Sequence, residues 1–447
     1  MTAPTDTIVA AATPPGRGGI GIVRISGSAV RKIAAAMLGG EPAPRHATLV
    51  DFLDAGGEPI DAGLALFFPA PQSFTGEDVL ELHGHGGPVV MDLLAARAIE
   101  LGARPARAGE FTERAFHNDK LDLAQAEAIA DLIDAGSAEA ARAALRSLAG
   151  DFSRESDELA ALVVQLRVFV EAAIDFPDED VELLASEEVR ARLEEISRRF
   201  ERIGRAAASG RALRDGLQVV IAGRPNAGKS SLLNALTGFD AAIVTEIPGT
   251  TRDLLRERIH VDGMPIHIVD TAGLRDTSDA IEVEGVRRAR AEAARADLVL
   301  YVVDGLCGLN DAELASVPAG KAALVVWNKT DLPQALPAPA FAHGAPVVAV
   351  SALTGAGLPA LRERLKSAAG YQGVEAGVFT ARRRHLDALA RARTLFELAE
   401  ARLGERSSFE LVAEELRQAQ RALGEITGET TSDDLLGSIF GQFCIGK

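Results

Sequence analysis

The segment Gly223–Ser230 limits the possible folds more than any other part of this chain. It has the pattern G-x-x-x-x-G-K-S, follows the apolar run Val219–Ala222, and precedes Ser231–Leu236, which is composed like the start of a helix. A glycine-rich turn between a strand and a helix lets successive backbone N–H groups point at phosphate oxygens, and the helix dipole favours their negative charge. A chance glycine-rich turn is the alternative, but it rarely has this strand–loop–helix context. We therefore expect a phosphate loop in which Lys229 reaches the β and γ phosphates and Ser230 binds Mg²⁺.

Three later segments, each directly after an apolar strand, add the remaining parts of a nucleotide site. Asp270–Gly273 can hold Mg²⁺ through water and touch the γ phosphate. Asn328–Asp331 ends in a carboxylate that can accept two hydrogen bonds from the guanine N1–H and exocyclic amine, a pair that adenine cannot supply. Ser351–Leu353 can support the base through a main-chain N–H. Each segment alone could be an ordinary turn, but the set in this order predicts a GTP-binding domain.

The stretch Thr245–Asp253, between the phosphate loop and Asp270, resembles the first switch loop of translation-factor-class GTPases. By that resemblance, Thr251 is the threonine that reaches Mg²⁺ and the γ phosphate. The residues expected to contact GTP are Asn226, Ala227, Gly228, Lys229, Ser230, Ser231, Thr245, Glu246, Ile247, Pro248, Gly249, Thr250, Thr251, Asp270, Thr271, Ala272, Gly273, Asn328, Lys329, Asp331, Ser351, Ala352 and Leu353.

The rest of the chain divides into segments of different character. Apolar strand runs alternate with helical stretches over residues 217–370, which predicts a parallel sheet with crossover helices. Residues 1–119 mix short β-like runs with one helical stretch. Residues 120–216 and 371–447 have helical periodicity, with one helix expected over Ser186–Ser209. We therefore predict a multidomain α/β plus α chain: an N-terminal α+β domain, then a discontinuous helical domain with an inserted Ras-like P-loop GTPase domain of the α/β class.

Composition narrows the classes of function. The chain has 47 Lys+Arg against 64 Asp+Glu, a net charge of −17, which argues against a protein that coats nucleic acid or membranes. The excess is largest over residues 120–216, with 13 basic and 21 acidic side chains. Two cysteines cannot make a disulfide framework, so we expect a reducing cytosol. The apolar runs are too short to cross a bilayer, and the N-terminus is unlike a signal peptide.

Leu274 occupies the position after Asp270–Gly273 where many GTPases place a Gln that orients the attacking water. A leucine side chain cannot hold water, so another residue must assist hydrolysis. Glu282 is a carboxylate of suitable reach, although it could be a solvated charge on a switch helix. Asn226 could ligate a monovalent cation beside the phosphates, or could stabilise its own turn. The residues alone leave both questions open.

Segments at both ends of the chain resemble the MnmE (TrmE) family of tRNA-modification GTPases. They are Asp6–Ala10, Thr13–Gly21, Ser73–Asp78, Asn118–Ala128 and the terminal Phe443–Lys447, which contains the family's Cys-x-Gly-Lys ending. The resemblance covers the whole chain. Its order of small domain, helices, inserted GTPase, helices and cysteine-containing tail is highly specific. It implies the division into residues 1–119 (folate binding and dimerisation), 120–216 and 371–447 (helical), and 217–370 (GTPase).

The same resemblance implies ligands for particular residues. A 5-formyltetrahydrofolate-type folate would contact Arg24, Glu81, Lys120 and Lys447. K⁺ would be held by Asn226, Thr245, Ile247 and Thr250, and Mg²⁺ by Ser230 and Thr251. Glu282 would position the attacking water and Lys229 would stabilise the phosphates. Cys444 would be either a catalytic thiol or an anchor for the tail.

At the level of the whole protein, the resemblance implies a cytoplasmic homodimer that hydrolyses GTP. With a MnmG (GidA)-type FAD protein, in a heterotetramer or larger complex, it would add a carboxymethylaminomethyl or aminomethyl group to C5 of the wobble uridine of certain tRNAs. Because of the charge of −17, we expect weak tRNA binding by this chain alone. The rival interpretations are a ribosome-assembly GTPase switch without modification chemistry and a scaffold dimer with a vestigial folate site.

Overall fold

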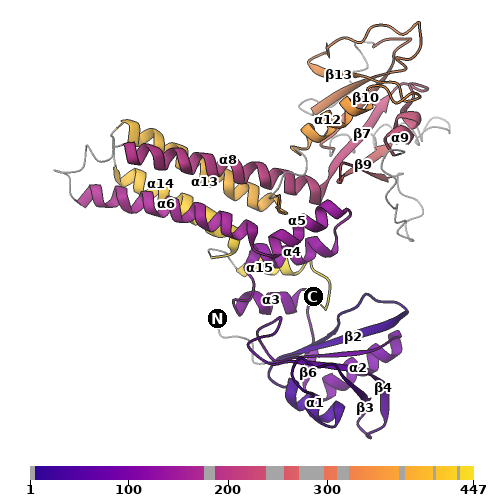
Figure 1. The fold of residues 1–447 in the computed structure, drawn as a ribbon, viewed down its shortest axis with the longest axis vertical. Helices are drawn as coiled ribbons and strands as arrows, with labels where there is room; N and C mark the ends of the chain where they lie inside the picture. The colour runs from indigo at the N-terminus through magenta and orange to yellow at the C-terminus, as the bar shows by residue number, and fades with distance from the viewer. Residues whose placement is uncertain are drawn as a thin grey trace. The chain divides into compact units, whose positions relative to one another are not determined.

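The computed structural model describes residues 6–175, 187–237, 256–270, 296–309, 322–371, 378–405, 409–429 and 433–446. The chain forms two compact units (Figure 1). The first, called here the N-terminal unit, combines Met1–Ala130 with Arg421–Lys447. The second, called here the central unit, is Asp131–Gln420. The C-terminal segment therefore belongs with the start of the chain.

The N-terminal unit contains a sheet of six strands in the order β3-β4-β5-β2-β1-β6. Neighbouring strands are antiparallel except β1 and β6, which are parallel. Helices α1 and α2 pack on this sheet and close a core that includes Ile33, Leu80 and Leu94. The bounds are β1 Thr7–Ala11, β2 Gly18–Ser26, α1 Val30–Leu38, β3 Thr48–Leu53, β4 Pro59–Phe68, β5 Val79–Gly86, α2 Pro88–Glu100 and β6 Ala103–Pro105. This confirms the predicted α+β character.

Helices from the two ends of the chain also pack together in the N-terminal unit. They are α3 (Glu110–His117), the first part of α4 (Leu123–Ile133) and α15 (Asp433–Phe440). Leu123 and Ala126 share a buried cluster with Ile439, Phe440 and Phe443. The segment 433–446 is thus held by apolar burial, which is the dominant favourable term in such packing.

Long helices form one part of the central unit: α5 (Ala138–Leu148), α6 (Asp151–Asp175), α8 (Glu187–Asp215), α13 (Arg383–Glu405) and most of α14 (Phe409–Thr427). Helix α8 packs along both α6 and α13 (Figure 1). The prediction that α8 ends near Ser209 was wrong. Gly210 stays helical, and a Cβ atom built there would lie 1.8 Å from the Phe379 carbonyl oxygen. That glycine serves a close backbone approach, not a helix end.

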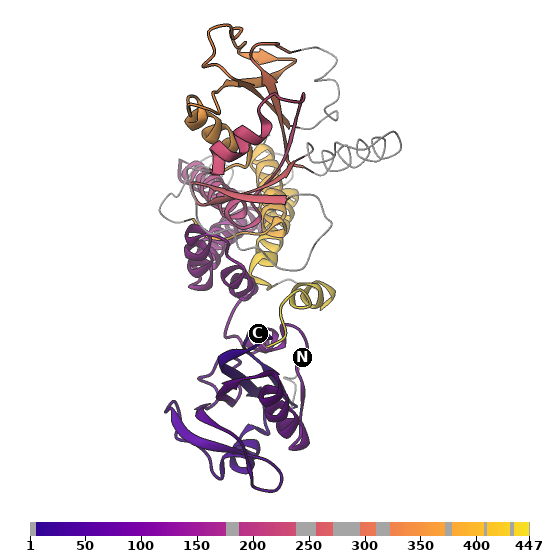
Figure 2. The ribbon, with the colours of Figure 1, turned by 90° about the vertical axis from the view of Figure 1, so that its right-hand side faces the viewer.

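The other part of the central unit is a seven-stranded sheet in the order β12-β13-β11-β10-β7-β9-β8, and its strands can be followed in Figure 2. Strands β9, β7, β10, β11 and β13 are mutually parallel, and β8 and β12 are antiparallel at the edges. The bounds are β7 Leu217–Gly223, α9 Lys229–Thr237, β8 Arg256–Val261, β9 Met264–Asp270, β10 Leu298–Asp304, β11 Ala322–Asn328, β12 Phe341–Ala342, β13 Ala345–Ala349 and α12 Leu358–Ala368. The predicted α/β domain with a parallel sheet is confirmed.

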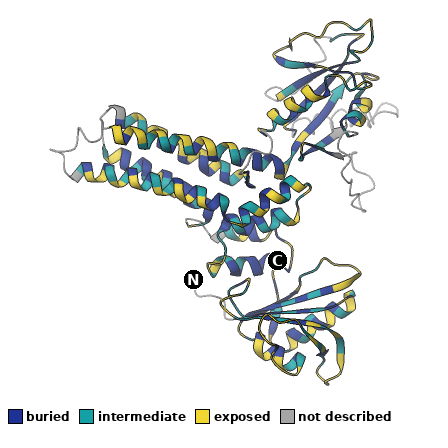
Figure 3. Cartoon of the chain, viewed as in Figure 1, coloured by how far each residue is buried: buried dark blue, intermediate teal, exposed yellow. Residues whose placement is uncertain are grey.

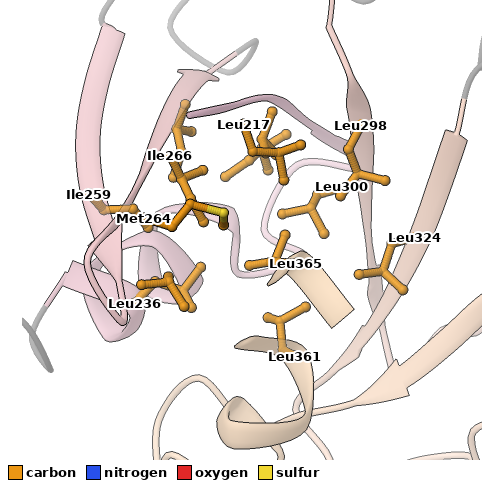
Figure 4. Close-up of a cluster of buried hydrophobic side chains, with 14 of the residues drawn as sticks. Leu217, Leu236, Ile259, Met264, Ile266, Leu298, Leu300, Leu324, Leu361 and Leu365 are labelled. Atoms are coloured by element: carbon orange, nitrogen blue, oxygen red, sulfur yellow. The ribbon is translucent and has the colours of Figure 1, made fainter. Parts of the chain in front are cut away.

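Apolar side chains from several strands and from α12 pack together in the core of this domain. Figure 4 shows Leu217, Ile266, Leu298 and Leu324 from four strands converging with Leu365 of α12. The central strands β7, β10 and β11 are mostly buried, as the dark blue in Figure 3 shows. Because the parallel strands are held in register, the loops after β7, β10, β11 and β13 meet at one edge of the sheet, where ligands of open α/β sheets bind.

Two features are absent from the residues that the structure describes. None of their helices is long and apolar enough to cross a membrane. They also contain no group of three or more His, Cys, Asp or Glu side chains placed to hold a metal ion.

Candidate functional site

The phosphate loop lies where the sequence predicts it, between the end of β7 at Gly223 and the start of α9 at Lys229. The ammonium of Lys229 donates to the carbonyl oxygens of Gly223, at 3.0 Å, and Arg224, at 2.8 Å. Ser230 and Ser231 lie exposed in the first turn of α9. The loop therefore presents a lysine cation and two hydroxyl groups at a helix N-terminus, an arrangement suited to a polyphosphate.

Two glycines of this loop are required by close contacts. A Cβ atom at Gly223 would lie 2.2 Å from the Val302 carbonyl oxygen of β10, and one at Gly228 would lie 2.2 Å from Nδ2 of Asn328. Both glycines also have positive φ angles, of 138° and 93°. Asn226 has φ of 60°, a left-handed conformation that Asn tolerates better than most residues. Any side chain at Gly228 would thus push away Asn328.

Asn328, at the end of β11, joins the phosphate loop to the loop after β13. Its Nδ2 donates to the Ala227 carbonyl oxygen at 3.0 Å, and its Oδ1 accepts from the Ala352 N–H at 3.1 Å. Asn328 is 2% exposed, so both polar ends of the amide are satisfied inside the protein. One side chain therefore fixes three loops that are far apart in sequence.

The loop after β11 presents an exposed carboxylate at Asp331. Ser351 donates from its hydroxyl to Asp331 Oδ1 at 2.6 Å and accepts from the Thr354 N–H at 3.1 Å. The Leu353 side chain is 85% exposed. Ser351 thereby holds the Asp331 carboxylate in a set orientation.

The structure adds a residue that no sequence motif marked. Asp304, the last residue of β10, accepts a hydrogen bond from the ammonium of Lys329 at 2.6 Å. Lys329 is thus tied to a neighbouring strand. An aspartate after a buried strand was visible in the sequence, but nothing in the spacing connected it to Lys329.

Several predicted site residues lie outside the described residues. They are Thr245, Glu246, Ile247, Pro248, Gly249, Thr250, Thr251, Thr271, Ala272, Gly273, Glu282 and Lys447. The backbone of Asp270 ends β9 and pairs with Ile221 of β7, next to the phosphate loop. The roles of these residues stay predictions.

A second candidate site lies in the N-terminal unit, where Arg24 of β2 and Glu81 of β5 face each other in register. Arg24 Nε donates to Glu81 Oε1 at 2.8 Å, and Nε2 of His83 lies 3.2 Å from Glu81 Oε2. The Arg24 guanidinium also lies 5.5 Å from the ring centre of Phe74 and 5.7 Å from that of Phe111. Two of the predicted folate-binding residues are therefore in direct contact.

The loop around Lys120 approaches the same neighbourhood. Asn118 Nδ2 donates to the Thr75 carbonyl oxygen at 2.7 Å. A Cβ atom at Gly76, whose φ is 80°, would lie 3.3 Å from Cε of Lys120. Thr75 and Gly76 directly follow Phe74, so the loop that carries Lys120 packs against the loop whose Phe74 contacts Arg24. A glycine at position 76 leaves room for the lysine side chain.

The cysteine-containing tail runs along the same unit. The Cys444 carbonyl oxygen accepts from the Gly109 N–H at 3.3 Å, and Ile445 pairs with Ala108. A Cβ atom at Gly446 would lie 2.2 Å from the Ala11 carbonyl oxygen. The Cys444 side chain is exposed. The tail is therefore anchored by its backbone while its thiol faces solvent.

Comparison with known protein families matches almost the whole chain. Residues 7–120 match the model described as the GTP-binding protein TrmE N-terminus, and residues 123–444 match the MnmE helical domain. The chain belongs to the MnmE family. This confirms the family predicted from the sequence.

Individual MnmE relatives agree with this assignment over their full lengths. The tRNA modification GTPase MnmE of Alkalilimnicola ehrlichii is 58% identical over 441 residues, covering 99% of each chain. That of Pseudomonas paraeruginosa is 56% identical over 455 residues, covering 100% of each. Among solved structures, the G domain of the T. maritima FeoB iron transporter is 27% identical over 34% of this chain and 98% of its own, with a TM-score of 0.26. The MnmE assignment rests on the sequence relatives.

Proposed function

We propose that this chain is a potassium-dependent GTP hydrolase that modifies tRNA together with a MnmG (GidA)-type flavoprotein. Its family membership makes it a tRNA modification GTPase. The observation that carries the GTP assignment is the Asn328 amide, which links the phosphate loop to the loop beside Ser351 and Asp331. This linkage sets a phosphate-binding end and a base-binding end at a fixed separation.

Within the proposal, water attacks the γ phosphate and GTP becomes GDP and inorganic phosphate. Lys229 neutralises phosphate charge, and Glu282 orients the water. The exposed Ser230 hydroxyl is the hard oxygen ligand that Mg²⁺ prefers, with Thr251 as a second. When bound, Mg²⁺ neutralises charge on the β and γ oxygens. We propose that K⁺ is held by the Asn226 side-chain oxygen and by Thr245, Ile247 and Thr250.

The N-terminal unit is proposed to bind the folate that supplies the one-carbon unit. Arg24 and Lys120 provide cations for its carboxylates, with Lys447 as a third. Glu81 provides an acceptor for the pterin N–H groups. The contact between Arg24 and Glu81 is support for this role, because it holds a donor and an acceptor together at one place. Cys444 is proposed as the nucleophile, with tail anchoring as the alternative.

We propose a cytoplasmic homodimer in which residues 1–119, 120–216 with 371–447, and 217–370 are the folate, helical and GTPase domains. Both cysteines, Cys307 and Cys444, are free and exposed, which suits a reducing compartment. Phosphoryl transfer makes no C–C bond, so we assign GTP hydrolysis to a conformational step and the redox chemistry to the partner's flavin.

The experiment that tests the whole proposal is reconstitution. The purified chain is combined with a MnmG-type flavoprotein, tRNA, GTP, formyl-folate and NADH, and the nucleosides are analysed. We expect the modified wobble uridine to form only when all are present. A chain that hydrolyses GTP but yields no modified nucleoside would favour a ribosome-assembly switch. Cys444→Ser in the same assay decides between its two roles: full modification would rule out a nucleophile.

The potassium proposal predicts a cation response. GTP turnover should rise at least about tenfold when sodium is replaced by potassium at constant ionic strength, because a fixed cation beside the phosphates stabilises the transition-state charge. Phosphate release measures it. Asn226→Gly keeps the positive φ and removes only the amide, so it should lose the response. Equal rates in the two salts would contradict K⁺ binding.

The folate proposal predicts a specific loss at Glu81. Glu81→Gln should weaken formyl-folate binding about thirtyfold, because an amide cannot accept from two pterin N–H groups with a full negative charge. Isothermal titration calorimetry measures the affinity. Glu41→Gln is the matched control, since Glu41 makes an exposed pair with Arg31 in the same unit. Unchanged affinity in Glu81→Gln would remove that residue from the site.

A further inference from the structure

The loop after β10 supports one side of the loop after β11, which carries the proposed base-recognition residues Asn328–Asp331. Asp304, the last residue of β10, lies in register opposite Asn328, the last residue of β11. The next residue, Gly305, donates its N–H to the Asn328 carbonyl oxygen at 2.9 Å, and a Cβ atom there would lie 2.7 Å from that oxygen. The Gly305 carbonyl accepts from the Leu336 N–H at 2.8 Å. The hydrogen bond between Gly305 and Asn328 places Asp304 directly beside the proposed guanine-recognition segment Asn328–Asp331.

Each carboxylate oxygen of Asp304 has its own partner. Oδ2 accepts from the Lys329 ammonium at 2.6 Å, and Oδ1 accepts from the Leu306 N–H at 3.0 Å. The Asp304 side chain is 16% exposed and that of Lys329 is 29% exposed, so the ion pair is shielded from solvent. Burial alone would raise the pKa of Asp304, but the hydrogen bonds from Lys329 and Leu306 outweigh it and lower that pKa.

Lys329 needs a carboxylate partner because of its position within the segment Asn328–Asp331. Its backbone has φ of 64°, in the left-handed region, which turns the chain sharply between Asn328 and Asp331. A lysine side chain has many rotamers, and a free ammonium here could pair with the Asp331 carboxylate that the base requires. Asp304 offers the cation a shielded partner at 2.6 Å and so leaves Asp331 to Ser351 and the ligand.

We propose that Asp304 is a positioning residue of the guanine-nucleotide site. It holds Lys329 in one conformation before the nucleotide arrives, which lowers the cost of ordering the site. The competing interpretation is that Asp304 only closes its own turn through the Leu306 N–H. The inference rests on the proposed GTP function.

The experiment is a double-mutant cycle on the full chain. Asp304→Asn keeps an oxygen for the Leu306 N–H but loses the ion pair, and Lys329→Met keeps the apolar stem of the lysine but loses its charge. Binding of a fluorescent GDP analogue (mant-GDP) is measured for the wild type, both single variants and the double variant. Trp327, which donates to the Leu336 carbonyl, reports by its fluorescence whether this region stays folded. The control is Glu363→Gln, which changes an exposed carboxylate on α12.

We expect about tenfold weaker binding in each single variant and no further loss in the double variant, because both changes remove one interaction. Losses that multiply in the double variant, or wild-type affinity in Asp304→Asn, would overturn the positioning role. Failure of the wild type itself to bind mant-GDP would instead refute the proposed function. If Asp304→Asn alters the Trp327 fluorescence, Asp304→Glu is measured in its place. The positioning role then requires that Asp304→Glu, which keeps the carboxylate, binds mant-GDP more tightly than Asp304→Asn.

Discussion

Asp331→Asn is expected to weaken GTP binding about 1,000-fold and to make XTP the preferred nucleotide. In the proposed site, the Asp331 carboxylate accepts from the guanine N1–H and from its exocyclic amine, whereas an Asn side chain would offer one acceptor and one donor. Xanthine has a carbonyl in place of that amine, so it complements the Asn donor. Because Ser351 holds Asp331 Oδ1 at 2.6 Å, the replaced side chain should keep its orientation and only the chemistry should change.

Competition of GTP and XTP against mant-GDP measures this exchange. Asp387→Asn is the control, since that carboxylate is exposed on α13 and its ion pair with Arg383 is long at 3.9 Å. Loss of both nucleotides together would show damage to the loop and not a change of specificity. Unchanged GTP affinity would remove Asp331 from base recognition.

The described parts of the proposed nucleotide site could be placed from sequence because each part is local. A strand, a glycine-rich turn and a helix start occupy adjacent residues around Gly223–Ser230, and Asn328–Asp331 directly follows a strand. Parallel strands bring such ends to one edge of the sheet, so proximity followed from the fold class. The hydrogen bond from Asn328 to Ala227 is consistent with that logic. Its dependence on Gly228, which leaves the space for the amide, is seen only in three dimensions.

Contacts between distant residues with ordinary side chains were not readable. Gly210 resembled a helix end until Phe379 was seen packed against it. Asp304 resembled any loop carboxylate. The same holds for Arg114, whose charge suggests a surface residue, although its side chain is 1% exposed. Charged groups are rarely buried without partners, and two of the three carboxylates that pair with Arg114, those of Asp6 and Glu77, lie far from it in sequence.

Arg114, on α3, is surrounded by three carboxylates. It donates to Asp6 Oδ1 at 2.7 Å, to both oxygens of Glu77 at 3.1 Å, and to Glu110 Oε1 at 3.2 Å. Burial alone would raise the pKa of Glu110, but hydrogen bonds from Arg104, the Arg107 N–H and Arg114 lower that pKa to about 2. The network therefore contributes stability that depends on ionised carboxylates.

Arg114→Met should destabilise the N-terminal unit by about 3–5 kcal/mol near pH 7, because it removes one partner from a buried charged network. The folded pKa of Glu110 is lower than its unfolded value, so its contribution is complete above pH values near the unfolded pKa of about 4.5. That contribution is lost as the pH falls towards about 2. In Arg114→Met, protonation at low pH also removes the negative charge of the carboxylates that have lost Arg114 as a partner. The difference between wild type and Arg114→Met should therefore shrink as the pH is lowered from 6 to 3.

Hydrogen exchange is the suitable measurement, because the only Trp and both Tyr residues, Trp327, Tyr301 and Tyr371, lie in the central unit and cannot report on this one. Peptides from β1, β2 and β5 should exchange faster in Arg114→Met, while peptides from β10 and β11 should not change. Arg31→Met is the control: Arg31 is half exposed and pairs with Glu41 and Asp78, so its loss should change the protection of these strands much less than Arg114→Met does. Equal protection of β1 in the wild type and Arg114→Met at pH 7 would show that the buried network adds nothing to the stability of this unit.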